Sequence, residues 1–334
     1  MPETKTPILQ VKNLRKDYKI RSSKLGGKPR ILHALSGVSL DVYEGETLGV
    51  IGESGCGKST LGKCIVQLTR ANSGEVIYGG NNICALSNSD LRPIRKELQM
   101  VFQDPYSSLD PRFTTRAAIE EPLLIHRMEP NAAKRREMVL SILREVGLDV
   151  QHMHRYPHEF SGGQRQRISV ARALVLEPKV IVCDEPVSAL DVSVQAQVLN
   201  LFSSLQKQRN LTYLFISHDL GVIKHISDRV AIMYLGTVVE LCGAHEIYQN
   251  PLHPYTKALL SAIPPDSPFE KGKQLPLSGE IPSPIGDLIG CPLAGRCPNR
   301  MDLCTQTRPA LTEVFPGHRV ACFLYHKEEY KEET

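Results

Sequence analysis

Near residue 50 the chain reads Gly52-Glu53-Ser54-Gly55-Cys56-Gly57-Lys58-Ser59-Thr60, directly after the apolar run Leu48-Gly49-Val50-Ile51. The apolar run predicts a buried strand, and a helix is expected to begin near Lys58. A glycine-rich turn between a strand and a helix lets backbone N–H groups surround phosphate oxygens, and the helix directs its positive end toward them. The segment is therefore a complete phosphate-binding P-loop, because a chance glycine-rich turn would lack this strand–loop–helix context.

The side chains of the P-loop have separate expected tasks. Lys58 should reach the β and γ phosphates of a nucleotide, and Ser59 should bind magnesium through its hydroxyl. A P-loop alone leaves kinases, GTPases and many ATPases open. The other residues of the motif predicted to bind the nucleotide are Gly52, Glu53, Ser54, Gly55, Cys56, Gly57 and Thr60.

A second apolar run ends in two carboxylates. Val180-Ile181-Val182-Cys183 predicts a buried strand, and Asp184 and Glu185 follow it. Asp184 is suited to the outer shell of magnesium, and Glu185 can polarise the attacking water as a general base. A surface acidic pair is the alternative, but a buried strand would deliver both side chains to its carboxyl end beside the P-loop.

Shortly before this strand the chain reads Phe160-Ser161-Gly162-Gly163-Gln164-Arg165-Gln166-Arg167. Ser161 can cap the amphipathic helix that follows, and the two glycines allow close approach of a phosphate. The segment resembles the signature sequence of the ATP-binding cassette (ABC) family, with Phe160 where that family usually has Leu. The resemblance implies that ATP on a facing subunit is contacted by Ser161, Gly162, Gly163 and Gln164.

The remaining motifs of the ABC family can be matched in order. Gln103 looks like the Q-loop glutamine that senses magnesium and the attacking water, so the resemblance implies that Ser59, Gln103 and Asp184 hold Mg²⁺ with ATP. His218 looks like the switch histidine that contacts the γ-phosphate, and Ser188-Ala189-Leu190-Asp191 matches the D-loop. Tyr18 looks like the aromatic residue that stacks on adenine. A tyrosine buried in the core is the alternative, because a single aromatic ring is a weak signal.

Chain length, hydropathy pattern and proline content predict two domains of unequal size. At roughly 150 residues per domain, 334 residues correspond to about two domains. The first 245 or so residues alternate apolar runs with amphipathic segments, as α/β domains do. The resemblance implies a RecA-like parallel sheet core, an antiparallel β subdomain and a helical subdomain at about 104–176. Ten prolines between 251 and 298 exclude long helices. We therefore expect an ATPase domain over 1–250 and a small, irregular, Cys-rich extension over 251–334.

Composition excludes several classes of protein. Lys and Arg exceed Asp and Glu by 40 − 36 = 4, too small an excess to indicate nucleic acid as a partner. No run approaches the ~18 apolar residues of a membrane span. The N-terminus lacks the apolar segment of a secretory signal. We expect a protein of the cytoplasm that reaches a membrane through partners.

Two segments resemble one branch of the ABC family. The Q-loop form Phe102-Gln103-Asp104-Pro105-Tyr106-Ser107-Ser108-Leu109-Asp110-Pro111-Arg112 and residues 250–264 are similar to the peptide and nickel importer branch. The resemblance implies an ATPase subunit that couples ATP binding and hydrolysis to uptake of di- or oligopeptides. Nickel, glutathione and opine uptake remain alternatives, as does, with less support, a soluble ABC ATPase without a transport role. An exporter ATPase would lack the proline-rich cysteine tail.

The same resemblance implies the partners. A second homologous ATPase subunit would pair with this one as a heterodimer, on two transmembrane permease subunits that receive substrate from an extracytoplasmic peptide-binding protein. The chain would lie peripherally on the cytoplasmic face of the inner membrane. The Q-loop and the helical segment 115–148 would contact short cytoplasmic helices of the permeases.

Four of the nine cysteines crowd near the C-terminus. Five, six and seventeen residues separate Cys291, Cys297, Cys304 and Cys322, which is not the C-x-x-C spacing of common zinc folds. In a reducing compartment, such a group is more typical of metal binding than of disulfides. Some members of the importer branch carry a 4Fe-4S cluster on four tail cysteines, and the resemblance implies one here. Zinc and packed free thiols remain the alternatives.

Overall fold

The computed structural model describes residues 6–20, 29–262, 275, 277–280, 282–286 and 289–325. Its strands are β1 (Pro7–Ile20), β2 (Arg30–Tyr43), β3 (Thr47–Ile51), β4 (Ser73–Tyr78), β5 (Asn81–Asn82), β6 (Leu98–Val101), β7 (Val180–Asp184), β8 (Thr212–Ser217), β9 (Arg229–Tyr234), β10 (Thr237–Gly243), β11 (Thr312–Phe315) and β12 (His318–Val320). Its α-helices are α1 (Lys58–Ile65), α2 (Asn88–Glu97), α3 (Pro105–Ser108), α4 (Thr115–His126), α5 (Ala132–Glu145), α6 (Gly162–Leu174), α7 (Val192–Arg209), α8 (Leu220–Ile226), α9 (Ala244–Gln249), α10 (Pro254–Ser261) and α11 (Leu303–Gln306). Short 3₁₀ turns cover Ile83–Ala85, Val150–His154 and Pro157–Glu159.

The strands form two sheets. The larger has the order β11-β12-β10-β9-β3-β8-β7-β6, and the smaller has the order β2-β1-β4-β5. Strands β9, β3, β8, β7 and β6 run parallel, whereas β10, β12 and β11 are antiparallel to their neighbours. All pairs of the smaller sheet are antiparallel. The parallel core with a separate antiparallel sheet confirms the ABC cassette fold that the motifs predicted.

Successive side chains of the central strands enter two different cores. On β7, Val180 and Val182 pack toward α1 and the smaller sheet, while Ile181 and Cys183 pack toward the helices on the other face. Alternation of this kind makes both faces of a parallel strand apolar, which is why its sequence is an unbroken apolar run. The runs at 48–51, 180–183 and 213–216 are therefore correctly predicted as buried strands.

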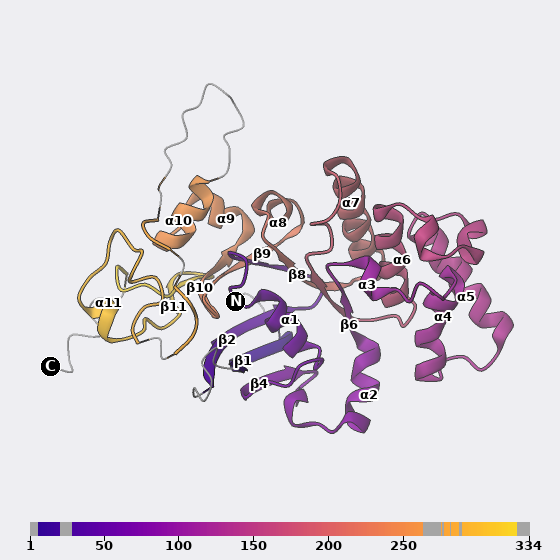
Figure 1. Ribbon diagram of the computed structural model, residues 1–334, viewed down its shortest axis with the longest axis horizontal. Coiled ribbons are helices and arrows are strands. Elements are labelled where there is room, and N and C mark those ends of the chain that lie inside the picture. Colours follow the sequence, from indigo (N-terminus) through magenta and orange to yellow (C-terminus); the bar gives the residue numbers. More distant parts are fainter. Residues whose placement is uncertain are drawn as a thin grey trace.

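The two ends of the molecule are built differently. Figure 1 shows α3, α4, α5 and α6 gathered at one end of the long axis, with α10, α11 and β11 at the opposite end. Helices α4 and α5 lie within 115–148, as the sequence predicted. The parallel strands of the larger sheet lie between these ends, and buried side chains pack on both of their faces.

The C-terminal part is more regular than the proline content suggested. Part of the proline-rich stretch lies outside the described residues. Within the rest, helix α10 begins at Pro254, and proline is tolerated in the first turn of a helix. Strands β11 and β12 form a hairpin, and β12 pairs with β10, so this part of the chain continues the main sheet. The expectation of an irregular segment is wrong here, because a short strand can obtain its hydrogen bonds from an existing sheet edge.

A buried carboxylate joins this part to the cassette. Glu240 on β10 is fully buried and accepts hydrogen bonds from the backbone N–H groups of Leu252 and His253, at 2.7 and 2.9 Å. Its Oε1 lies 2.7 Å from Nε2 of His318 on β12. Burial opposes ionisation, but these hydrogen bonds hold the pKa of Glu240 below its ordinary value. One charged group thus receives donors from two segments, and removing either of them would leave it poorly compensated.

His253 beside it is buried as a neutral imidazole. Its Nδ1 accepts from the N–H of Tyr255 at 3.1 Å and so caps α10. Burial lowers the pKa of His253 to about 4, although the charge of Glu240 opposes this and Lys257 adds to it. The folded state therefore keeps this histidine neutral at pH values where an exposed histidine is protonated.

We predict that His253→Asn flattens the pH dependence of stability between pH 7 and pH 5. Below about pH 6.5 the unfolded chain binds a proton at His253, whereas the folded chain does not until about pH 4. Stability should therefore fall with pH, by on the order of 2 kcal/mol over this range at His253. Protonation of Glu240 affects the pH dependence of stability only below the ordinary glutamate pKa of 4.5, outside this range. The Asn side chain retains an oxygen that can cap α10. Chemical denaturation at both pH values measures the difference, and equal pH slopes for the two proteins would contradict it.

Candidate functional site

The predicted nucleotide-binding residues converge on one cavity. The P-loop, Gln103, Asp184–Glu185 and His218 each follow or end one of the strands β3, β6, β7 and β8, whose carboxyl ends meet at one edge of the sheet. A cavity of about 530 Å³ lies at this edge. It is lined by Tyr18, Leu32, Ala34, Ser54, Gly55, Gly57, Lys58, Ser59, Thr60, Gln103, Glu185, His218 and Pro284.

The P-loop backbone requires glycine at its last turn. Gly57 has a φ of 104° directly before α1, a conformation that side chains of L-residues rarely adopt. A Cβ atom there would lie 2.3 Å from the carbonyl oxygen of Ala34. Lys58 follows, and its Nζ donates to the carbonyl oxygens of Gly52 at 2.7 Å and Glu53 at 3.0 Å. The lysine charge is thus held by backbone dipoles at the start of a helix, where phosphate oxygens are favoured.

Ser59 and Asp184 form a pair of oxygen ligands. The Ser59 hydroxyl donates to Oδ1 of Asp184 at 2.7 Å. Asp184 is buried, and burial raises its pKa even though the Ser59 hydrogen bond and two nearby lysines oppose the shift. A hydroxyl and a carboxylate are ligands of the kind that Mg²⁺ prefers, so the donor set fits a magnesium ion bound together with phosphates.

Three predicted catalytic side chains are in contact. Gln103 Nε2 donates to Oε2 of Glu185 at 3.0 Å, and Nδ1 of His218 lies 3.1 Å from the same oxygen. Glu185 has a φ of 46°, and the N–H of Glu185 donates to the carbonyl of Ile216 at 3.0 Å. A non-glycine residue in this region costs on the order of 1–3 kcal/mol, and such strain is common at active sites. The arrangement orients one carboxylate oxygen beside the cavity, as a general base requires.

Tyr18, on β1, is one of the residues that line the cavity. Its side chain is 39% exposed, which excludes the alternative of a core tyrosine. The Lys16 ammonium lies 5.0 Å from the ring centre, and Leu32, Ala34 and Pro284 line the cavity beside the ring. A partly exposed ring with apolar neighbours can stack on a planar base. Sequence reasoning missed these three neighbours, since β2 carries no motif and Pro284 is one of many prolines.

Some predicted residues do not line this cavity. Ser161 caps α6 and shares a capping box with Gln164, but Ser161, Gly162, Gly163 and Gln164 are absent from the cavity lining within the described residues. Phe160 before them is buried and packs edge-on against the ring of His152 at 5.4 Å. Gly52, Glu53 and Cys56 of the P-loop also lie outside the lining, and the Glu53 carboxylate is directed toward Arg296. Asp184 is absent from the lining too and is linked to it through the hydroxyl of Ser59.

The four tail cysteines share a different, much smaller cavity. Cys291, Cys297, Cys304 and Cys322 line a space of about 10 Å³, together with His253 and Phe323 among others. Burial raises the pKa of Cys291 to about 11 and that of Cys322 to about 12. Over the described ranges, no group of three or more Cys, His, Asp or Glu side chains is arranged to hold a metal ion. The predicted iron–sulfur or zinc site therefore gains no support from the geometry of the described residues.

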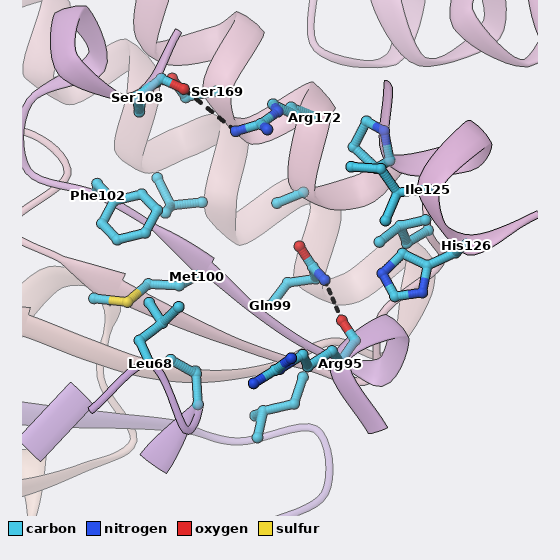
Figure 2. Close-up of a pocket in the computed structure, with 16 residues that line it drawn as sticks. Leu68, Arg95, Gln99, Met100, Phe102, Ser108, Ile125, His126, Ser169 and Arg172 are labelled. Carbon is cyan, nitrogen blue, oxygen red and sulfur yellow. Dashed lines mark hydrogen bonds between the residues drawn. The ribbon is translucent and has the colours of Figure 1, made fainter. Parts of the chain in front are cut away.

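A third cavity lies between the sheet and the helices. It measures about 250 Å³ and is bounded by β6, the α3–α4 region and α6. Figure 2 shows Leu68, Met100 and Phe102 on one side of it and Ile125 and His126 on the other, with Arg95 and Arg172 at its ends. Leu68 and Ile125 are more than half exposed. Arg95 Nε and His126 Nδ1 are buried without a hydrogen-bond partner in the part of the chain that is described.

The described residues contain no helix that is both long and apolar enough to cross a membrane.

Comparison with known proteins agrees with this geometry. A family model described as "ABC transporter" matches residues 35–188, and one described as "Oligopeptide/dipeptide transporter, C-terminal region" matches residues 239–304. The chain superposes on a dimeric ATP-binding cassette, MJ0796 in a post-hydrolysis state with ADP and phosphate, with a TM-score of 0.62 and 29% identity. That match covers 71% of this chain and 98% of the cassette.

Closer relatives extend over nearly the whole chain. The oligopeptide transport ATP-binding protein OppF of Salmonella typhimurium is 49% identical, and the match covers 96% of this chain and 97% of OppF. The oligopeptide transport ATP-binding protein AppF of Bacillus subtilis is 50% identical, with 95% and 97% covered. The dipeptide transport ATP-binding protein DppF of Escherichia coli is 47% identical, with 97% and 96% covered. The chain therefore belongs to the family of oligopeptide and dipeptide transport ATP-binding proteins, within the ABC transporter ATPases.

Proposed function

We propose that the chain is the ATP-hydrolysing subunit of an importer that carries di- or oligopeptides across the cytoplasmic membrane. The observation that carries this proposal is that similarity to peptide transport ATP-binding proteins continues beyond the cassette, through residues 239–304. The chain would act on the cytoplasmic face of that membrane as a peripheral subunit. The nucleotide-binding cavity described above, with the P-loop and Glu185 beside it, supports this proposal.

In this proposal the residues around the cavity divide the reaction between them. Lys58 and the P-loop N–H groups bind the β and γ phosphates, and Ser59 and Asp184 hold Mg²⁺, which neutralises phosphate charge. Glu185 takes a proton from the water that attacks the γ-phosphorus, and ADP leaves as the P–O bond breaks. Gln103 and His218 act by orienting the Glu185 carboxylate that they contact.

A second ATPase subunit would complete the site. Ser161 and the glycines after it do not line the cavity of their own chain, although Ser161 caps a helix whose N-terminus favours anions. A facing subunit would supply the equivalent residues to this ATP, and this chain would supply its own to the partner's. ATP binding would therefore close the pair, and hydrolysis would reopen it.

The third cavity is suited to the permease subunits. Its floor is apolar, its rim includes the exposed Leu68 and Ile125, and Phe102 in its wall is next to Gln103 of the catalytic group. Buried nitrogens of Arg95 and His126 have hydrogen-bonding capacity that a docked segment could use. A short amphipathic helix of a permease would bury its apolar face here, so that movement of the Q-loop is transmitted to the membrane subunits.

We also propose that the four tail cysteines bind a 4Fe-4S cluster, with zinc as the alternative. Support comes from their shared cavity and from the soft character of thiolate ligands. Because burial raises the pKa of Cys291 and Cys322, binding would have to release protons and bring the sulfur atoms together. Such a group would stabilise the tail and take no part in hydrolysis.

We predict that Lys58→Ala impairs ATP binding, whereas Glu185→Gln impairs ATP hydrolysis. Lys58→Ala removes a charge-assisted phosphate contact and should weaken ATP binding by about 10–100-fold. Glu185→Gln should keep ATP affinity within about twofold, slow hydrolysis by about 10²-fold or more, and trap an ATP-bound pair with the partner ATPase. Nucleotide binding, turnover on the assembled complex and size-exclusion chromatography measure these effects. A Glu185→Gln complex with wild-type turnover would exclude Glu185 as the general base.

Introducing charge at the rim of the third cavity should disrupt assembly. Leu68→Asp combined with Ile125→Asp should reduce co-purification with the permeases at least about tenfold, since each apolar side chain contributes roughly 1.5–3 kcal/mol when buried. ATP binding by the isolated chain should not change. Phe315→Asp, at an exposed apolar residue on β11, is the matched control. Normal assembly of the double variant would show that the permeases dock elsewhere.

Protein purified without oxygen should contain iron and acid-labile sulfide if the cysteines hold a cluster. Cys304→Ser, at a buried cysteine of the shared cavity, should lower both contents to background, whereas Cys84→Ser, far along the chain, should leave them unchanged. One zinc per chain and no sulfide would favour the alternative metal. Metal-free wild-type protein with a protease-resistant tail would establish the packed-thiol arrangement instead.

A further inference from the structure

The part of the chain after residue 250 contacts the P-loop directly. Tyr255 on α10 is buried, and its hydroxyl accepts a hydrogen bond from the backbone N–H of Glu53 at 3.0 Å. Its ring packs against Tyr234 of β9, with ring centres 4.6 Å apart. A fixed aromatic side chain therefore holds the second residue of the P-loop from outside the cassette motifs.

A second contact comes from the loop that carries the cysteines. Nη1 of Arg296 lies 3.4 Å from both carboxylate oxygens of Glu53 and 3.3 Å from the Tyr234 hydroxyl. The side chains of Arg296 and Glu53 are only 11% and 26% exposed. An ion pair this shielded from water is screened less than a surface pair, so it constrains the two side chains more strongly.

Glu53 connects these contacts to Lys58. Its N–H is bound by Tyr255, its carboxylate by Arg296, and its carbonyl oxygen accepts from the Lys58 ammonium at 3.0 Å. The N–H of Cys56 also donates to this carbonyl oxygen, at 3.2 Å. Every polar group of Glu53 is thus engaged, and two of its four partners belong to the C-terminal part. Displacing Glu53 would displace a carbonyl that places the lysine charge.

The C-terminal part also contributes to the wall of the nucleotide cavity. The N–H of His33 on β2 donates to the carbonyl of Pro284 at 2.9 Å, and the N–H of Gly286 donates to the carbonyl of Ile31 at 3.1 Å. Pro284 lines the nucleotide cavity together with Tyr18. The segment around Pro284 is therefore fixed to β2 at the wall where a base would lie.

We propose that Arg296 is a positioning residue of the nucleotide site: through Glu53 it holds the P-loop in the conformation that receives phosphate, so that the C-terminal part tunes ATP affinity. This inference rests on the proposed binding of ATP at Lys58. Tyr255 assists from the backbone side of the same residue.

The expected effect is on binding and not on the chemical step. Gly52, Gly55 and Gly57 give the loop many alternative conformations, and ordering it on binding costs conformational entropy. A loop already held by Arg296 requires less ordering when ATP arrives, which favours binding. Glu185, Gln103 and His218 are on other strands and do not contact Arg296, so turnover at saturating ATP should be preserved.

The test compares Arg296→Ala, Arg296→Lys and Arg300→Ala in the full chain. Arg300 is an exposed arginine of the same loop and serves as the matched control. Arg296→Ala should weaken ATP binding about tenfold and raise KM in the assembled transporter by a similar factor, with kcat within about twofold. Arg296→Lys retains a cation and should recover most of the affinity, and Arg300→Ala should bind as the wild type does.

A double-mutant cycle separates positioning from a general loss of structure. If Arg296 acts through Glu53, Arg296→Ala should weaken ATP binding less than about twofold in a Glu53→Gln background. Wild-type ATP affinity in Arg296→Ala, or the same loss in both backgrounds, would overturn the inference. The Lys58→Ala variant tests the proposed function separately. If Lys58→Ala binds ATP with wild-type affinity, the proposed function fails, and this inference fails with it. If Arg296→Ala binds ATP with wild-type affinity but Lys58→Ala does not, only this inference fails and the proposed function stands.

Discussion

The site depends on one constraint, that five parallel strands end at the same edge of a sheet. Gln103, Asp184 and His218 are far apart in the sequence, but each follows or ends a strand whose neighbours are set by backbone hydrogen bonds. Apolar side chains on both faces of each strand hold this edge in place from two cores. The Ser59–Asp184 hydrogen bond and the contacts of Glu185 follow from that placement.

This constraint explains which parts of the protein could be predicted. A buried parallel strand has a recognisable apolar run, and the residue after it must lie at the carboxyl edge, so the P-loop, Asp184 and Glu185 could be assigned from the sequence. The ABC resemblance added Tyr18, Gln103 and His218, whose local sequences alone are weak. Each assignment made from the strand pattern needs only a short segment of sequence and the knowledge that parallel strands end at the same edge of the sheet.

Contacts between distant segments could not be predicted in this way. The pairing of Arg296 with Glu53 joins residues 243 positions apart, and neither residue has a pattern that points to the other. The pairing of β12 with β10 depends on a three-residue strand that has no distinctive periodicity. The cysteines show the same limit: their clustering in sequence predicted a metal site, but no metal-binding arrangement is found among the described residues. Spacing along the chain does not define directions in space.

The pairing of β12 with β10 has a consequence for any shortened form of this chain. In the full chain the hydrogen-bonding groups of β10 are covered on both sides, by β9 and by β12. A chain that stopped near residue 250 would expose β10 as an open sheet edge, and it would leave the buried Glu240 without His318. Open edges with apolar neighbours pair with other chains. The C-terminal strands therefore also protect the cassette against self-association, independently of any role in transport.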